Sequence, residues 1–274
     1  MSGTRLDQRL VELGHFESRE KARATIMSGL VFVNGQRADK PGAQVAPDVK
    51  IEVRGNTLPY VSRGGFKLEK ALKVFPIDPT GLTCIDCGAS TGGFTDVLLK
   101  NGAAKVYAVD VGYGQLDWKL RSDERVVCME RTNARYMEPG WFAERPDFAS
   151  MDVSFISIRL LLPQVFSCLR EGALAVILVK TQFEAGRDKV GKNGVVRDPQ
   201  THRTVLLNVA KFAFETGFQV QHLDYSPITG PKGNIEFLLV LQKPSGSALA
   251  AADLSLEETV EETVADAHAT HRNV

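Results

Sequence analysis

A short, mostly apolar run followed by a glycine-rich turn constrains the fold more than any other stretch of this 274-residue chain. Residues 82–85 are typical of a buried strand, and a helix is expected after the turn, through Leu98 and Leu99. Glycine allows tight turns and close approaches that a Cβ would prevent. The stretch therefore predicts a strand–turn–helix unit that holds a ligand, and its candidate contacts are Asp86, Gly88, Ser90, Gly92, Gly93 and Phe94.

The residues of the turn also narrow the class of ligand. The G-x-G-x-x-G spacing of dinucleotide-binding folds does not occur here. Asp86 places a carboxylate where a pyrophosphate would lie, which is unfavourable because the charges have the same sign. A ligand with a cationic end, such as the amino group or sulfonium of S-adenosylmethionine, fits better. An ordinary strand–turn–helix corner without a ligand is the alternative.

Strands and helices alternate from residue 82 onward. This order predicts an α/β fold with a mostly parallel seven-stranded sheet and helices on both of its faces. The expected strands are 82–86, 105–110, 125–130, 147–152, 173–180, 218–224 and 235–242, and the expected helices are 93–101, 115–120, 158–169 and 200–216.

Polar residues stand at the expected ends of successive strands. Ligands of open α/β sheets bind at the carboxyl ends of the strands, where Asp110 can accept hydrogen bonds from a ribose diol and Asn133 can contact an adenine edge. Asp152 and Lys180 end two further strands, and Glu236 lies near the start of the last one. A charge in such an apolar run needs a partner or water. Each residue alone could be an ordinary strand-end charge, but the set favours a site.

The N-terminal part carries a different pattern. Leu6, Leu10 and Leu13 share one helical face, Ser18 can cap a second helix, and residues 34–35 are the Asn-Gly pair of a tight hairpin. This order of residues resembles the small RNA-binding module of ribosomal small-subunit protein S-four and of pseudouridine synthases. The resemblance implies a small α+β RNA-binding domain, whose candidate phosphate contacts are Arg5, Arg9, Arg19 and Arg23.

Charge is distributed unevenly along the chain, although its net charge is zero. Residues 246–274 hold six acidic residues and one arginine, so the rest of the chain has a net charge of +5, which is compatible with nucleic acid. The sequence predicts an RNA-binding domain over 1–58, a linker over 59–64, the α/β domain over 65–244 and, over 245–274, an acidic tail that is disordered or a loose helix. Further candidate RNA contacts are Arg63 and, in a basic loop over 184–198, Lys189 and Lys192.

Several functional classes are not favoured. No run approaches the ~20 apolar residues of a membrane-spanning helix, and the first residues have no secretion signal. Two of the four cysteines, Cys84 and Cys87, lie in an expected buried strand, and no second pair follows at zinc spacing. We therefore expect no metal, no disulfide framework, no membrane partner and a cytoplasmic location.

The charged residues form a pattern that resembles a known family. The FtsJ-like S-adenosylmethionine-dependent ribose 2′-O-methyltransferases use a Lys-Asp-Lys-Glu tetrad, which Lys67, Asp152, Lys180 and Glu236 match in order. The stretch 86–94 is similar to the cofactor motif of that family, except that Ser90-Thr91 replaces Ala-Pro. The resemblance implies a Rossmann-like methyltransferase fold with S-adenosylmethionine as cofactor, to which Asp152 would also contribute.

The fusion of the two domains looks specifically like the TlyA family. The motifs that support this resemblance are Ser-Arg-Gly-Gly-x-Lys-Leu at 62–68 and Asp-Val-Ser-Phe-Ile-Ser at 152–157. That likeness implies methyl transfer to the ribose 2′-hydroxyl of cytidine in 23S or 16S ribosomal RNA. Under this hypothesis Lys180 is the base or the main orienting group, Lys67 stabilises the developing alkoxide, and the two acids position them. Phe155 and Phe183 could stack on a nucleotide, although core packing is favoured for both.

Three other functions remain open at this point. A membrane-active cytolysin, which the common label haemolysin suggests, would need an amphipathic or apolar segment that the sequence does not display. A non-catalytic RNA-binding chaperone would need no methyl donor. A methyltransferase for another acceptor, such as transfer RNA or a base nitrogen, is the third; the tetrad argues against base chemistry but not against transfer RNA.

Overall fold

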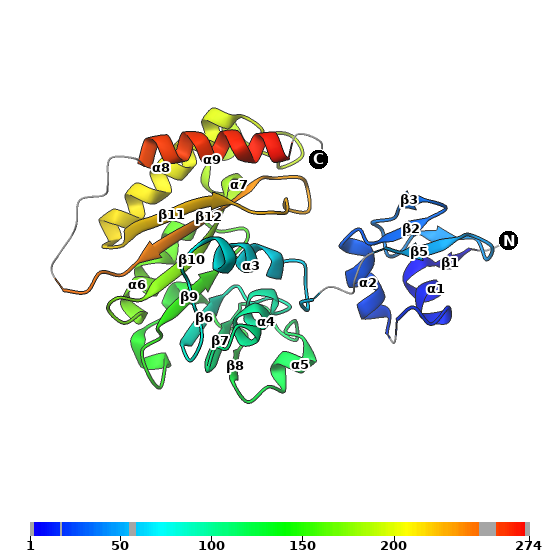
Figure 1. The fold of residues 1–274 in the computed structure, drawn as a ribbon, viewed down its shortest axis with the longest axis horizontal. Helices are drawn as coiled ribbons and strands as arrows, with labels where there is room; N and C mark the ends of the chain where they lie inside the picture. Colours follow the sequence, from blue (N-terminus) through cyan, green and yellow to red (C-terminus); the bar gives the residue numbers. More distant parts are fainter. Residues whose placement is uncertain (1–2, 17, 55–58, 247–255, 272–274) are drawn as a thin grey trace. The chain divides into compact units, whose positions relative to one another are not determined.

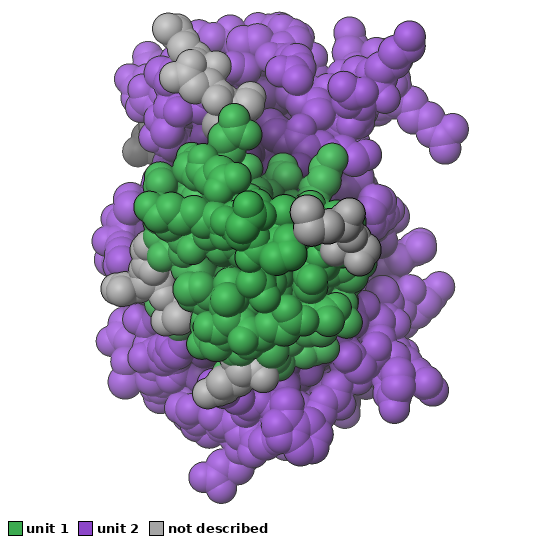
Figure 2. All heavy atoms as spheres, turned by 90° about the vertical axis from the view of Figure 1, so that its right-hand side faces the viewer, with its two compact units in different colours: residues 1–63 green, residues 64–274 purple. Residues whose placement is uncertain are grey.

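The structure, a computed structural model, describes residues 3–16, 18–54, 59–246 and 256–271. The chain divides into two compact units, residues 1–63 and 64–274, which Figure 2 draws in different colours. The expected domain edge at residue 58 lies outside the described residues, so the predicted domain boundaries remain predictions.

The described residues of the N-terminal unit form two short helices and five short strands: β1 (Thr4–Arg5), α1 (Leu6–Glu12), α2 (Arg19–Met27), β2 (Val31–Val33), β3 (Gln36–Arg37), β4 (Gln44–Val45) and β5 (Ile51–Val53) (Figure 1). Ser18 caps α2 by accepting a hydrogen bond from the Lys21 amide. Asn34 and Gly35 have φ of 50° and 80°, which closes the antiparallel β2–β3 hairpin. The predicted helix pair and hairpin are both present. The buried core residues are Leu6, Leu10, Ala22, Ile26, Val31 and Val45.

The second unit is built on a seven-stranded sheet of order β11-β12-β10-β9-β6-β7-β8. Its strands are β6 (Thr83–Cys87), β7 (Lys105–Val109), β8 (Val126–Met129), β9 (Phe148–Met151), β10 (Leu174–Lys180), β11 (Gln219–Tyr225) and β12 (Glu236–Gln242). Neighbours among β10, β9, β6, β7 and β8 pair in parallel, whereas β12 is antiparallel to both of its neighbours, β10 and β11. The predicted mostly parallel α/β sheet is confirmed, and each strand begins and ends within one residue of its expected bounds.

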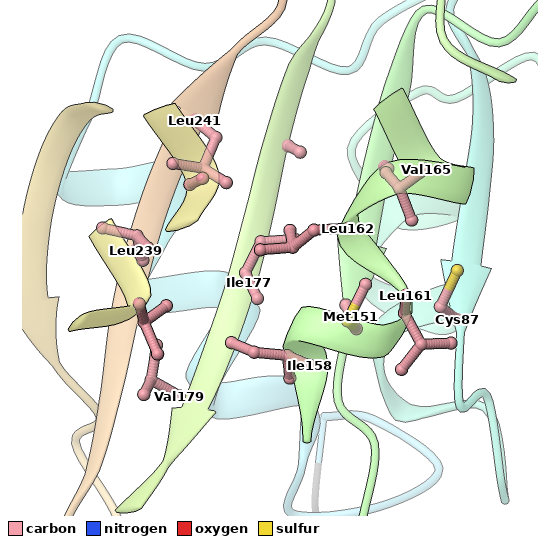
Figure 3. Packing of buried hydrophobic residues seen from close by; sticks show 14 of the residues in the cluster. Cys87, Met151, Ile158, Leu161, Leu162, Val165, Ile177, Val179, Leu239 and Leu241 are labelled. Atoms are coloured by element: carbon pink, nitrogen blue, oxygen red, sulfur yellow. The ribbon is translucent and has the colours of Figure 1, made fainter. Parts of the chain in front are cut away.

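Helices cover both faces of this sheet (Figure 1). They are α3 (Gly65–Val74), α4 (Gly93–Lys100), α5 (Trp118–Arg121), α6 (Leu162–Cys168), α7 (Thr181–Glu184), α8 (Pro199–Thr216) and α9 (Leu256–Thr270). Successive strand residues point to opposite faces, and in β6 Asp86 meets α4 while Ile85 joins the core with α6 and α8. Figure 3 shows part of that core, where Ile177 of β10 lies beside Leu162 of α6.

The C-terminal segment departs from expectation. A disordered tail is wrong for α9, and the alternative of a loose helix is correct only in being helical, because α9 packs on α8 and β11. Val260, Val264 and Ala267 are at most 2% exposed and join the main core. The spacing of these residues is that of an amphipathic helix, but the surrounding glutamates dilute the apolar signal. Residues 247–255 and 272–274 lie outside the described residues.

Candidate active site

Four charged residues that are distant along the chain meet at one edge of the sheet. Lys67 lies in the first turns of α3, Asp152 directly follows β9, and Lys180 is the last residue of β10. Glu236 opens β12 and is the cross-strand partner of Lys180. Because β12 runs antiparallel to β10, its first residue lies at the edge where the parallel strands end. The sheet itself therefore brings Asp152, Lys180 and Glu236 together.

The four side chains form one continuous ion-pair network. Lys67 Nζ lies 3.0 Å from Asp152 Oδ2 and 2.7 Å from Glu236 Oε2. The other Asp152 oxygen, Oδ1, lies 2.5 Å from Lys180 Nζ, which also donates to Ser154 Oγ at 2.8 Å. Asp152 thus bridges both lysines.

Burial makes this network electrostatically strong. Lys67 and Lys180 are each 8% exposed and Glu236 is 2% exposed. Burial disfavours the Lys67 ammonium, but the carboxylates of Asp152 and Glu236 outweigh it and raise the Lys67 pKa. Burial likewise opposes ionisation of Asp152, yet the two lysines lower its pKa. The network is balanced, with two cations and two anions.

The expectation that Asp86 faces a ligand is not met. Asp86 is fully buried, and its Oδ2 accepts hydrogen bonds from the Thr95 amide and hydroxyl at 2.9 and 2.7 Å. Its Oδ1 accepts from Ser150 Oγ at 3.1 Å. Burial raises the Asp86 pKa to about 6, although these hydrogen bonds oppose the shift. Asp86 therefore fastens the first turn of α4 to β6 and β9.

The glycine-rich turn lies against the backbone of the tetrad. Gly88 has φ of +79°, and a Cβ there would lie 2.7 Å from the Asp152 carbonyl oxygen. Gly92 has φ of +96°, and a Cβ there would collide with Leu120. Gly93 and Phe94 are buried at the start of α4, so Phe94 is a core residue rather than a ligand contact.

Asp110 organises the loop beside this turn. Its Oδ2 accepts from the Ser90 amide at 2.8 Å and its Oδ1 from the Gly112 amide at 2.7 Å. Ser90 itself is exposed and has φ of 49°. Each carboxylate oxygen keeps a lone pair, so half-buried Asp110 can still accept from a ribose diol. The Asn133 Oδ1 accepts from the Arg135 amide, which leaves the Asn133 amide group as a donor.

The donor set at this edge suits S-adenosylmethionine. Gly88 leaves the space that a Cβ would fill next to Asp152, Asp110 offers acceptors for a diol, and Asn133 offers a donor. Among the described residues, no group of three or more His, Cys, Asp or Glu side chains is arranged to hold a metal.

Two supporting residues were missed from the sequence. Glu130, after β8, accepts hydrogen bonds from the Arg121 guanidinium and from backbone amides of residues 114–116, and these lower its pKa to about 2. Gly230 leaves room for Glu236, because a Cβ there would lie 2.9 Å from Glu236 Oε1. Glu130 ends the expected strand 125–130, so the strand-end pattern could have found it, whereas no sequence signal distinguishes Gly230.

Phe155, three residues after Asp152, departs most from expectation. Core packing was favoured for it, but its side chain is 91% exposed and its backbone has φ of 65°, which is rare for a bulky residue. The Phe155 ring lies 5.3 Å from that of Phe183. Glu184 holds the same loop, since it accepts from Ser157 Oγ at 2.7 Å and from the Ile158 amide at 2.8 Å.

The candidate RNA contacts lie in separate places. Arg5, Arg19 and Arg23 surround Asp7, whereas Arg9 pairs with Glu12 and donates to the Pro47 carbonyl at 2.9 Å. In the second unit, Lys189 and Lys192 are exposed and line a hollow of about 310 Å³ together with Arg197. Arg63 is half-buried.

Comparisons with known proteins identify the family of this chain. The family model described as FtsJ-like methyltransferase matches residues 60–243, and that of the S4 domain matches residues 4–51. The chain is 54% identical to the Bacillus subtilis protein named "Putative rRNA methyltransferase YqxC", over 97% of this chain and 94% of that protein. It is 44% identical to the Mycobacterium tuberculosis protein named 16S/23S rRNA (cytidine-2'-O)-methyltransferase TlyA, over 96% and 97% of the two chains.

A solved structure is similar along the whole chain. The protein described as "Putative hemolysin from Streptococcus thermophilus" is 49% identical, with a TM-score of 0.78 over 99% of this chain and 98% of that one. The matched FtsJ-like region contains all four residues of the ion-pair network. The chain belongs to the FtsJ-like methyltransferase family and carries an S4 domain at its N-terminal end.

Proposed function

We propose that this protein transfers a methyl group from S-adenosylmethionine to the ribose 2′-hydroxyl of cytidine in ribosomal RNA. The observation that carries the proposal is the network of Lys67, Asp152, Lys180 and Glu236, which joins four separate elements beside the glycine-rich turn. The name of the Mycobacterium tuberculosis relative supports the acceptor atom and the nucleotide. The site of action is the cytoplasm, where ribosomal RNA is found.

A ribose hydroxyl is a poor nucleophile, so the site must remove its proton as the oxygen attacks. Lys180 takes this proton at Nζ after releasing one of its own, while Asp152 and Ser154 hold the nitrogen in place. We assign the base to Lys180 rather than Lys67 because Lys67 contacts two carboxylates and Lys180 contacts one.

Lys67 has the complementary role. Its raised pKa keeps it an ammonium, and two of its three N–H groups point to Asp152 and Glu236. The third stabilises negative charge that develops on the ribose oxygen. Asp152 and Glu236 therefore position the cation rather than react.

The glycine-rich turn and the neighbouring loop would hold the methyl donor. S-adenosylmethionine, when bound, supplies an electrophilic methyl group on its sulfonium. Asp110 would accept from the ribose diol of this cofactor, and Asn133 would contact its adenine. Gly88 and Ser90 shape the turn, which Asp86 and Gly92 keep in place from inside the protein.

Phe155 would hold the target nucleotide. A duplex or stacked base must be taken out of its stack before its ribose can enter a site of this kind. Aromatic rings stack on such bases. The exposed Phe155 ring, three residues after Asp152 and backed by Phe183, offers that surface.

The two units would share the binding of RNA. In the N-terminal unit Arg5, Arg9, Arg19 and Arg23 are candidate phosphate contacts. Arg63 is the last residue of the same unit, and in the second unit Lys189 and Lys192 lie in the basic loop.

The rival functions have less support. Some similar proteins carry the name hemolysin, but no helix among the described residues is both long and apolar enough to cross a membrane. A non-catalytic RNA chaperone would not need two lysines buried against two acids, which costs desolvation energy.

Methyl transfer to purified ribosomal RNA tests the proposal. Wild-type protein with S-adenosylmethionine should produce ribose-methylated cytidine, detected by mass spectrometry of nuclease digests. Lys180→Ala should reduce the rate at least about 100-fold, because general base catalysis contributes that much. Lys211→Ala, an exposed residue of α8, is the matched control and should leave the rate unchanged. Activity of Lys180→Ala near the wild-type rate would refute the assignment.

A further inference from the structure

The N-terminal unit contains a buried carboxylate that the proposed reaction does not use. Asp7, in the first turn of α1, is fully buried, yet three guanidinium groups surround it. Arg5 contacts it through two nitrogens, with Nε 3.0 Å from Oδ1 and Nη2 2.9 Å from Oδ2. Arg19 Nη2 lies 3.1 Å and Arg23 Nε 3.6 Å from the same Oδ2. We call these four residues the Asp7 cluster.

Neutralising Asp7 does not explain this arrangement. The bidentate contact with Arg5 already pairs the carboxylate, and the Gln8 amide also donates to Oδ1 at 2.9 Å. Arg19 and Arg23 add two positive charges next to a cation, which is repulsive at this range. The cluster therefore has a net charge of +2 without a ligand to balance it.

The guanidinium groups are placed to receive such a ligand. Asp7 has no exposed surface, but the side chains of Arg5, Arg19 and Arg23 are 39%, 48% and 53% exposed. Each guanidinium has five N–H donors, and the carboxylate occupies only some of them. The Arg5 group also lies beside Gly42, where a Cβ would come within 3.1 Å of it. The contacts with Asp7 thus bring the three guanidinium groups to one place, and Gly42 leaves room for that of Arg5.

We propose that Asp7 is a positioning residue that gathers Arg5, Arg19 and Arg23 into one site for consecutive phosphates of the RNA backbone. A planar guanidinium matches the oxygens of a phosphate in a bidentate manner, and several together suit the negative charge of consecutive phosphates. The inference rests on the proposed RNA-directed function and assigns the organising role to the one acid of the group. Arg9 is outside the cluster because Glu12 and Pro47 hold it.

Substitution of Asp7 should change RNA affinity in opposite directions, depending on whether Asp7 merely repels RNA or positions the three arginines. If Asp7 were only a negative charge near an RNA surface, Asp7→Asn would tighten RNA binding by reducing repulsion. If it positions the arginines, the same change should weaken binding of full-length protein to purified ribosomal RNA about tenfold near 0.1 M salt. The slope of log affinity against log salt should become shallower by about one to two, because each lost phosphate contact contributes about 0.7–0.9.

Matched variants separate positioning from general damage. Glu12→Gln removes another acid of α1 and should leave RNA affinity unchanged or slightly tighter. Arg19→Gln and Arg23→Gln keep the Arg5–Asp7 pair and should each lower affinity severalfold in the wild-type background. In the Asp7→Asn background each arginine substitution should lower RNA affinity less, because the three guanidinium groups are no longer held together. Affinity for S-adenosylmethionine, measured by calorimetry, should stay within about twofold in every variant.

The outcomes are decisive in both directions. Tighter or unchanged RNA binding by Asp7→Asn would overturn the inference, as would full additivity of Asp7→Asn with the arginine variants. If Asp7→Asn does not fold, unchanged salt slopes in Arg19→Gln and Arg23→Gln overturn it. Loss of affinity for an acidic protein but not for RNA would assign the site to a protein partner and also overturn it. Failure of the proposed function is a separate result, since it would appear as absent ribose methylation by wild-type protein.

Discussion

The ion-pair network of the second unit and the Asp7 cluster of the N-terminal unit use the same charges in opposite ways. The network has two lysines and two acids, all largely hidden from water. The Asp7 cluster has one hidden acid and three half-exposed arginines. A balanced, buried group fixes atoms at angstrom precision, whereas an unbalanced, exposed group attracts a charged partner. This difference favours a catalytic role for the ion-pair network and an RNA-binding role for the Asp7 cluster.

The first prediction removes the balance of the network. Lys67→Met leaves the Asp152 and Glu236 carboxylates without the cation that lies between them, so the protein should lose about 3–5 kcal/mol of unfolding free energy. Denaturant unfolding followed by circular dichroism measures this loss. Lys211→Met, at a side chain that is 76% exposed, should change the unfolding free energy by less than about 0.5 kcal/mol. Equal effects of the two substitutions would contradict the contrast between buried and exposed charges.

The second prediction uses salt to separate the two regions. If three arginines each neutralise one phosphate, raising potassium chloride from about 50 to about 200 mM should increase the KM for RNA on the order of 20-fold. The buried network is shielded from salt, so kcat at saturating RNA should change less than about twofold. Steady-state methyl transfer at each salt concentration supplies both constants. If kcat fell with rising salt as steeply as the affinity for RNA, the salt-sensitive charges would act in the methyl-transfer step and not only in RNA binding.

The third prediction concerns an apolar group that borders the balanced network. Phe155→Ala should lower kcat/KM about tenfold, since stacking on one base contributes about 1–3 kcal/mol. Its side chain is 91% exposed, so the unfolding free energy should not decrease. Phe155→Leu keeps an apolar side chain without an aromatic ring and is the matched control. Wild-type kinetics in Phe155→Ala would remove this residue from the substrate site.

The fourth and smallest effect is a pH dependence of stability. The Arg5 hydrogen bonds and the nearby Arg19 hold the Asp7 pKa far below its usual value despite burial. A depressed carboxyl pKa stabilises the fold above the unfolded-state value, near 4, and this stabilisation disappears as the pH falls. The melting temperature of wild type should therefore exceed that of Asp7→Asn by a few degrees at pH 7. The gap should narrow below about pH 4, and a gap that widens there would have the wrong sign.

The sequence predicted the sheet because strand periodicity and glycine turns are local signals. It also predicted three members of the network, since Asp152, Lys180 and Glu236 stand at strand ends. Lys67 precedes the sheet on a helix, so only the family resemblance pointed to it. That these four residues carry catalysis remains a prediction, and their geometry is compatible with it.

What the sequence could not provide depends on burial and neighbours. Asp86 and Asp110 are both acids at strand ends, but Asp86 is enclosed by Thr95 and Ser150 whereas Asp110 stays half-exposed. Phe155 is indistinguishable from a core aromatic residue until its left-handed backbone is seen. The apolar stripe of α9 was hidden by its glutamates. Each case was decided by contacts between residues distant along the chain.

The pairing of Lys180 with Glu236 makes strand register a determinant of activity. Adjacent positions of β12 point to opposite faces, so a slip of one residue would direct Glu236 away from Lys67 and leave an apolar side chain in its place. A one-residue deletion in the connection between β11 and β12 that shifts this register would therefore inactivate the enzyme, although every functional side chain is retained. The length of that connection is therefore as much a part of the active site as the charges that it brings together.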